Sequence, residues 1–105
     1  MIEKLESFRA HLEAERLRGL IAQGYTPEHH PHACRVKMGH KYANVDTDGP
    51  ITWSGRYMVD LATNEIFGIK GYGVIHRGHR FGTLDTINEW DWSGYRAVRR
   101  QQQAA

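Results

Sequence analysis

Residues 71–82, with the sequence GYGVIHRGHRFG, decide how the second half of this chain folds. The stretch holds four glycines, two histidines, two arginines and two aromatic residues, a mixture typical of a tight turn between strands. We predict a β-hairpin whose two-residue loop lies at Arg77–Gly78. His76 and His79 would then be directly opposed, with their Cβ atoms about 4.5–5.5 Å apart on one face.

The glycines of this stretch do not match a nucleotide-binding loop. A dinucleotide fingerprint needs a glycine at the position of His76, and a P-loop needs Gly-Lys followed by Ser or Thr. Neither pattern occurs in the stretch. We therefore expect the glycines to mark bends and turns in a tightly curved sheet.

Short β segments with turn residues between them precede this hairpin. Residues 46–50, DTDGP, and residues 60–65, DLATNE, have the composition of turns. Because the connections are this short, neighbouring strands should be antiparallel. The predicted strands are 35–38, 41–45, 52–59, 66–72, 74–76 and 79–84.

Helices are predicted at both ends of the β segments. Apolar residues in 2–23 recur at three- and four-residue steps, and Gly24 is suited to end such a helix. Thr86 and Glu89 fit the capping box and predict a short C-terminal helix. The predicted fold class is α+β: an N-terminal amphipathic helix packed on a curved antiparallel sheet of four to six strands. An alternative use of the long helix is to pair with a second copy as a homodimer.

The 105 residues are enough for one domain but not comfortably for two. No apolar run reaches the ~20 residues of a membrane span, and we expect no secretory signal. A single cysteine makes a reducing, cytoplasmic location the simplest expectation. The parts are an N-terminal helix (1–24), a His/Pro linker (25–34), a β-rich core with the short C-terminal helix (35–95), and a basic, frayed tail (96–105).

A cluster of metal-binding residue types occupies the linker, where His29, His30, His32 and Cys34 lie within six residues. Structural zinc sites usually combine two separated ligand pairs, and a second clear pair is missing here. No set of acid, base and nucleophile typical of catalysis is recognisable. We therefore assign no catalytic residue, metal ligand or cofactor, and keep a histidine-based metal-binding protein as the second alternative.

Aromatic and cationic residues alternate through the β-rich part of the chain. Rings and cations on one sheet face make a platform for unpaired bases, because stacking and phosphate contacts combine there. The net charge of +2 permits phosphate contacts without demanding them. The candidate nucleic-acid contacts are Tyr72, His76, Arg77, His79, Arg80 and Phe81, with the arginines on phosphates and Tyr72 or Phe81 stacking on bases.

The segment 41–95 resembles a group of short uncharacterised proteins encoded by tailed bacteriophages. The shared features are SGRYMVD at 54–60, IFGIK-x-YGVIHRGH at 66–79 and GTLDT at 82–86. The resemblance covers about half of the chain and brings no activity with it. It implies a phage origin, the cytoplasm of the host cell, and a small accessory protein that binds host or phage macromolecules.

These features together favour a non-enzymatic accessory protein that binds nucleic acid through the hairpin at 71–82. The first alternative is a protein-interaction module that modulates a host or phage protein. No membrane partner is expected.

Overall fold

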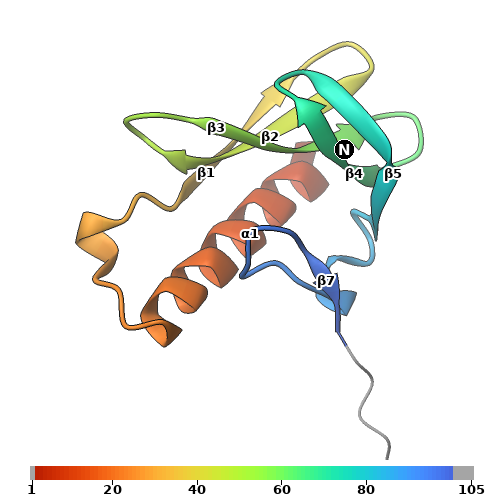
Figure 1. Cartoon of the computed structure of the whole chain (residues 1–105). Helices are drawn as coiled ribbons and strands as arrows, with labels where there is room; N and C mark the ends of the chain where they lie inside the picture. The colour runs from red at the N-terminus through yellow and green to blue at the C-terminus, as the bar shows by residue number, and fades with distance from the viewer. Residues whose placement is uncertain (1, 101–105) are drawn as a thin grey trace, which may run out of the picture.

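The structure, a computed structural model, describes residues 2–100 and has one long helix packed against a five-stranded antiparallel sheet (Figure 1). The sheet is a meander in the order β1-β2-β3-β4-β5, and β6 and β7 form a second, two-stranded sheet. The predicted α+β class, with an N-terminal helix on an antiparallel sheet, is confirmed. The elements are α1 (Ile2–Ala22), a 3₁₀ turn η1 (Pro27–His29), β1 (Ala33–Met38), β2 (Tyr42–Gly49), β3 (Ser54–Asp60), β4 (Glu65–Gly71), β5 (Val74–Thr83), a 3₁₀ turn η2 (Ile87–Glu89), β6 (Trp90–Asp91) and β7 (Val98–Arg99).

Helix α1 matches the predicted range 2–23 to within one residue. Gly24 ends the helix in the left-handed conformation, with a φ of 85°. The N–H of Gly24 donates to the carbonyl of Ile21 and the N–H of Tyr25 to that of Leu20, both at 3.0 Å. These two hydrogen bonds form a Schellman motif, which satisfies carbonyls that a helix end leaves unpaired.

The core lies between α1 and the sheet. Leu5, Phe8 and Leu12 share one face of α1 and are at most 2 % exposed. The ring of Phe8 meets the rings of Tyr57 and Trp92 edge to face, with centroids 6.1 Å and 4.8 Å away. The apolar stripe of the helix therefore packs against the chain's own sheet and C-terminal residues.

The C-terminal segment, residues 90–100, folds back along α1 and covers the core (Figure 1). The ring of Trp92 is fully buried, and its backbone N–H donates to the Glu15 carboxylate of α1 at 2.8 Å. Gly19 permits the close approach, because a Cβ there would lie 2.9 Å from the backbone oxygen of Ser93. Residues 90–100 are thus held against helix α1.

Residues 87–89 form the 3₁₀ turn η2 in place of the predicted short C-terminal helix. The Thr86 hydroxyl accepts the N–H of Thr83 at 2.9 Å and does not cap a helix, and the chain then enters β6. Residues 98 and 99, which the sequence assigns to the tail, pair with β6 as β7. Residues 101–105 of that tail lie outside the described part of the chain.

The turn of the β4–β5 hairpin lies at Tyr72–Gly73, and the prediction of a turn at Arg77–Gly78 is wrong. Gly71 pairs with Val74 across the observed turn. Gly73 supplies a φ of 77°, which tight hairpin loops require, whereas the φ of Gly78 is not positive. The predicted strands at 74–76 and 79–84 are therefore parts of one strand, β5.

A bulge in β5 occupies the position of the predicted turn. The register of β5 against β4 shifts between His76 and Arg80, so residues 77–79 bulge out of the ladder. His76 and His79 are therefore not a cross-strand pair. The bulge nevertheless brings their imidazoles into parallel contact, with ring centroids 3.9 Å apart and planes 4° from parallel.

Strand β2 continues to Gly49 and so includes residues 46–49 of the stretch 46–50, where the sequence predicts a turn. Asp46 and Thr47 are fully buried and continue the ladder with β3, and the turn follows at 50–53. The Asp46 carboxylate accepts a hydrogen bond from Nε of Arg35 at 2.9 Å. A polar residue with such a partner is tolerated inside a sheet, which composition alone does not reveal.

Replacing Gly73 with alanine is expected to lower the free energy of unfolding by about 1 kcal/mol, because alanine is strained at positive φ. Gly71→Ala is the matched control, since a Cβ there meets nothing within 4 Å. Its expected change is within about 0.5 kcal/mol, or a slight stabilisation. Urea unfolding of both variants measures the difference, and equal losses would contradict a turn at Tyr72–Gly73.

Candidate functional site

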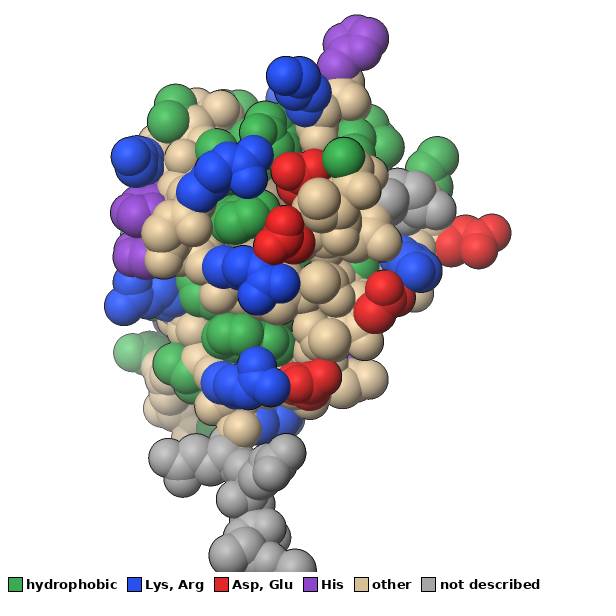
Figure 2. Space-filling view, turned by 90° about the vertical axis from the view of Figure 1, so that its right-hand side faces the viewer, with side chains coloured by type: hydrophobic (Ala, Val, Ile, Leu, Met, Phe, Trp, Pro, Cys, Tyr) green, Lys and Arg blue, Asp and Glu red, His purple; other side chains and the backbone are tan. Residues whose placement is uncertain are grey.

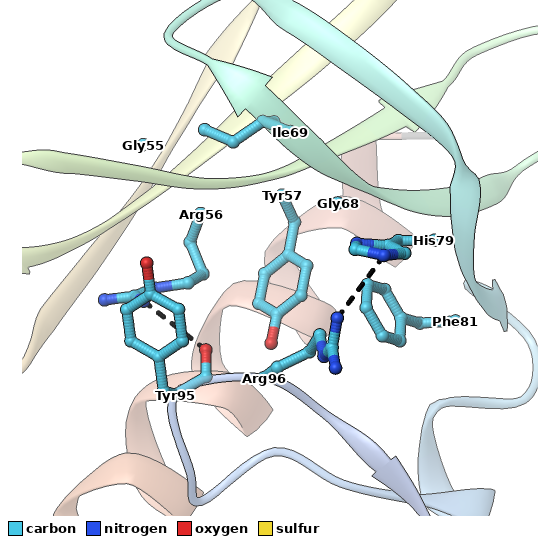
Figure 3. Close-up of a pocket in the computed structure, with 9 residues that line it drawn as sticks. All are labelled: Gly55, Arg56, Tyr57, Gly68, Ile69, His79, Phe81, Tyr95 and Arg96. Carbon is cyan, nitrogen blue, oxygen red and sulfur yellow. Dashed lines mark hydrogen bonds between the residues drawn. The ribbon is translucent and has the colours of Figure 1, made fainter.

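A hollow of about 470 Å³, called the pocket below, opens between the sheet and the C-terminal segment (Figure 3). Strands β3, β4 and β5 form one side of it, and residues 95–96 form the other. Its principal side chains are Arg56, Tyr57, His79, Phe81, Tyr95 and Arg96.

The floor of the pocket consists of two buried aromatic rings. Tyr57 and Phe81 are 2 % and 5 % exposed, and their rings meet edge to face with centroids 5.5 Å apart. The Tyr57 hydroxyl accepts the N–H of Ala97 at 3.2 Å. Burial raises the pKa of Tyr57 to about 12, so its hydroxyl stays neutral at physiological pH. The floor is therefore uncharged and closed by the core.

The polar side chains of the pocket include two arginines and a histidine, and none of the pocket residues is acidic. Arg96 is exposed and forms no ion pair with any carboxylate of residues 2–100. Arg56 pairs with Asp48 at 3.2 Å, but that carboxylate also pairs with Arg16. One negative charge thus serves two guanidinium groups, and the pocket retains a net positive charge.

Tyr95 stands at the edge of the pocket and is 83 % exposed. The guanidinium of Arg56 lies over its ring, 4.3 Å from the centroid, and donates to the Tyr95 backbone oxygen at 3.4 Å. The two side chains lie together on one side of the pocket, while His79 and Phe81 lie on the other (Figure 3). A flat ring held in place at the mouth of a cationic pocket can stack on another planar group.

Among residues 2–100, His79 is the one histidine that lines the pocket. Gly68 gives it room, because a Cβ on Gly68 would lie 3.2 Å from the Cβ of His79. The Nη1 of Arg96 lies 3.4 Å from Nε2 of His79, and since a guanidinium only donates, this ring nitrogen is the acceptor. Desolvation lowers the pKa of His79, and the nearby charges of His76 and Arg96 lower it further. His79 is therefore neutral at pH 7.

The arginines that the sequence singles out, Arg77 and Arg80, are paired with carboxylates outside the pocket. Arg77 lies 3.5 Å from Asp60 and donates to the Tyr42 hydroxyl at 2.6 Å, and Arg80 pairs with Glu65. Figure 2 shows a face on which cations alternate with apolar side chains and have acidic side chains beside them. On Arg77 and Arg80 the positive charge is already compensated.

The predicted aromatic contacts also lie apart. Tyr72 folds over the sheet face away from α1, where its hydroxyl donates to Asp46 at 3.2 Å, and it is 55 % exposed. Phe81 is buried in the core, so the prediction that it stacks on bases at the surface is wrong. Of the six predicted contacts, only His79 and Phe81 line the pocket, and His76 stacks on His79 from behind.

The sequence places Arg56, Tyr95 and Arg96 among the alternating aromatic and cationic residues but does not single them out as site residues. A further signal is the run after residue 95, which has three arginines and no acid. Nothing in the sequence connects that run to β3 or to the bulge of β5. The connection arises from the packing of the C-terminal segment on α1.

The linker residues do not form a metal site in the described part of the chain. No three His, Cys, Asp or Glu side chains among residues 2–100 come together in a way that could hold a metal ion. The Nδ1 atoms of His30 and His32 are hydrogen-bonded to backbone oxygens. Cys34 is buried, and burial raises the pKa of its thiol to about 12, which suits neither a nucleophile nor a zinc ligand.

Comparison of this chain with protein-family models, with curated proteins and with solved structures finds no match. The resemblance of residues 41–95 to phage proteins therefore stays a prediction from its motifs. None of the helices formed by residues 2–100 has the length and apolar character needed to cross a membrane.

Proposed function

We propose that this protein is a non-enzymatic nucleic-acid-binding protein that holds its ligand at the pocket. The observation that carries the proposal is a pair of cations, Arg56 and Arg96, beside His79 in a pocket without acidic side chains. Arginine forks match phosphate oxygens in geometry and charge. An arginine without a carboxylate partner, such as Arg96, can bind a phosphate without first breaking an ion pair.

Tyr95 supports an unpaired strand as the ligand. Its ring is exposed and is braced by Arg56, and stacking of a base on an aromatic ring contributes about 1–3 kcal/mol in single-strand binding proteins. In a duplex the bases are stacked on each other and do not offer a free face. A single strand with a phosphate in the pocket and a base on Tyr95 uses both features.

The position of this contact surface differs from the sequence expectation. The hairpin arginines Arg77 and Arg80 carry compensated charges, so they contribute less to phosphate binding than Arg96. If the phage resemblance holds, the ligand would be a phage or host nucleic acid in the cytoplasm of an infected cell.

A protein-interaction module is the second candidate function. A shallow hollow of about 200 Å³ lies between the start of α1 and the end of β1, lined in part by Ile2, Val36 and Met38. Ile2 and Met38 are 70 % and 52 % exposed, and exposed apolar side chains around a hollow favour a protein contact.

A dimer formed through this end of α1 is expected to dissociate more readily in Met38→Lys, because a charge would replace an apolar contact. Sedimentation analysis of the unchanged protein and the variant measures the dimer dissociation constant.

Arg96→Gln is expected to weaken binding of a fluorescein-labelled ten-nucleotide single strand by about 10- to 100-fold, the range for one charge-assisted hydrogen-bonding group. Arg80→Gln removes the same charge from an arginine that is already paired, so its loss should stay below about threefold. Fluorescence anisotropy at low salt measures both variants against the unchanged protein. Equal losses would contradict the pocket as the contact, and the absence of any binding would contradict the function.

Affinity is also expected to rise as the pH falls from 7.5 to about 5.5. The pKa of His79 is lowered in the free protein, and a phosphate beside it would raise that pKa, so ligand binding takes up a proton. The ionisable neighbours are His76, which stacks on it, and Arg56, Tyr57 and Arg96 around the pocket. Among them, His76 is the other imidazole.

In His79→Gln the pH dependence should flatten. Anisotropy titrations at four pH values compare the two proteins. An identical pH dependence in both would contradict a role of His79 beside the phosphate.

A further inference from the structure

We propose that the pocket recognises the terminal phosphate of a strand, a phosphomonoester, in preference to the phosphodiesters within it. This inference rests on the proposed function and assigns its ligand more narrowly. It follows from three properties of the pocket. The core closes its floor, its positive charge is larger than the single negative charge of a phosphodiester, and its volume is larger than that of a phosphate group.

The pocket is closed at the back by the core. Tyr57 and Phe81 form the floor, and the ring of Trp92, which is fully buried, lies behind both with centroids 5.2 Å and 6.2 Å away. On the C-terminal side, the N–H of Ala97 is bonded to the Tyr57 hydroxyl. A ligand group that reaches the floor cannot continue past these residues, and a terminal phosphate has no further chain on that side.

The cations of the pocket outnumber the charge of a phosphodiester. A phosphodiester carries one negative charge, whereas a terminal phosphate carries about −1.5 to −2 at pH 7 and has three free oxygens. Arg96 is uncompensated, and Arg56 shares the single charge of Asp48 with Arg16. His79 adds a further positive charge when it takes up a proton. A phosphate with two charges matches this arrangement, and a second charge on the ligand also favours that protonation.

The size of the pocket suits a terminal nucleotide. Its volume of about 470 Å³ lies within the ~300–1,000 Å³ typical of small-molecule sites and exceeds the space that a phosphate group alone fills. Tyr95 stands at the mouth, on the side of Arg56 and across the pocket from His79 (Figure 3). The phosphate would lie against Arg96 and His79, and the terminal base would lie on the exposed ring of Tyr95.

The test uses ten-nucleotide single strands of one sequence with a 5′-phosphate, a 3′-phosphate or hydroxyl groups at both ends. They compete with a labelled strand for the full chain in anisotropy measurements. One of the phosphorylated strands is expected to bind at least tenfold more tightly than the hydroxyl strand. This preference should disappear in Arg96→Gln and persist in Arg80→Gln, while circular dichroism checks that both variants are folded.

Other outcomes separate this inference from the proposed function. If all three strands bind equally and Arg96→Gln weakens them equally, recognition of a strand end is wrong and nucleic-acid binding at the pocket stands. If a preference for one phosphorylated strand persists in Arg96→Gln, the end is recognised elsewhere and the inference is again wrong. If no strand binds at low salt, both proposals are overturned.

Discussion

The carboxylate of Glu15 joins the first helix of the protein to the last part of the described chain, and the candidate site depends on this contact. Glu15 is 7 % exposed, so its charge is stable there only with partners. It accepts the N–H of Trp92 and pairs with Arg100, each at 2.8 Å. Gly19, one turn further along α1, leaves space for the backbone of the C-terminal segment. The contact fixes the backbone of Trp92 on α1, while its ring packs on Phe8 and Tyr57 in the core.

The pocket exists because three parts of the chain meet. The docked C-terminal segment contributes Tyr95 and Arg96, β3 contributes Arg56, and the bulge of β5 turns His79 toward them. None of these parts forms a site alone, because each cation would stand on an open surface. Packing on α1 converts separate surface cations into one cationic pocket with a closed floor.

Local signals in the sequence were sufficient for α1 and for the antiparallel strands, because their periodicity and turn residues depend on near neighbours. They were insufficient for the last hairpin, since Gly73 and Gly78 are equally suited to a turn by composition. The choice is made by distant contacts, such as the packing of the Tyr72 ring over Gly55. The site was hidden for the same reason. Whether an arginine is free or paired depends on acids distant in sequence, as for Arg80.

Amide hydrogen exchange of Trp92 tests the anchoring of the C-terminal segment most directly. Its N–H is buried and bonded to Glu15, so it should exchange about 100-fold or more slowly than in an unfolded peptide. In Glu15→Ala this protection should fall, while the amides of β2 and β3 keep theirs. Exchange of Trp92 at the unfolded rate in the unchanged protein, or full protection in Glu15→Ala, would contradict the account.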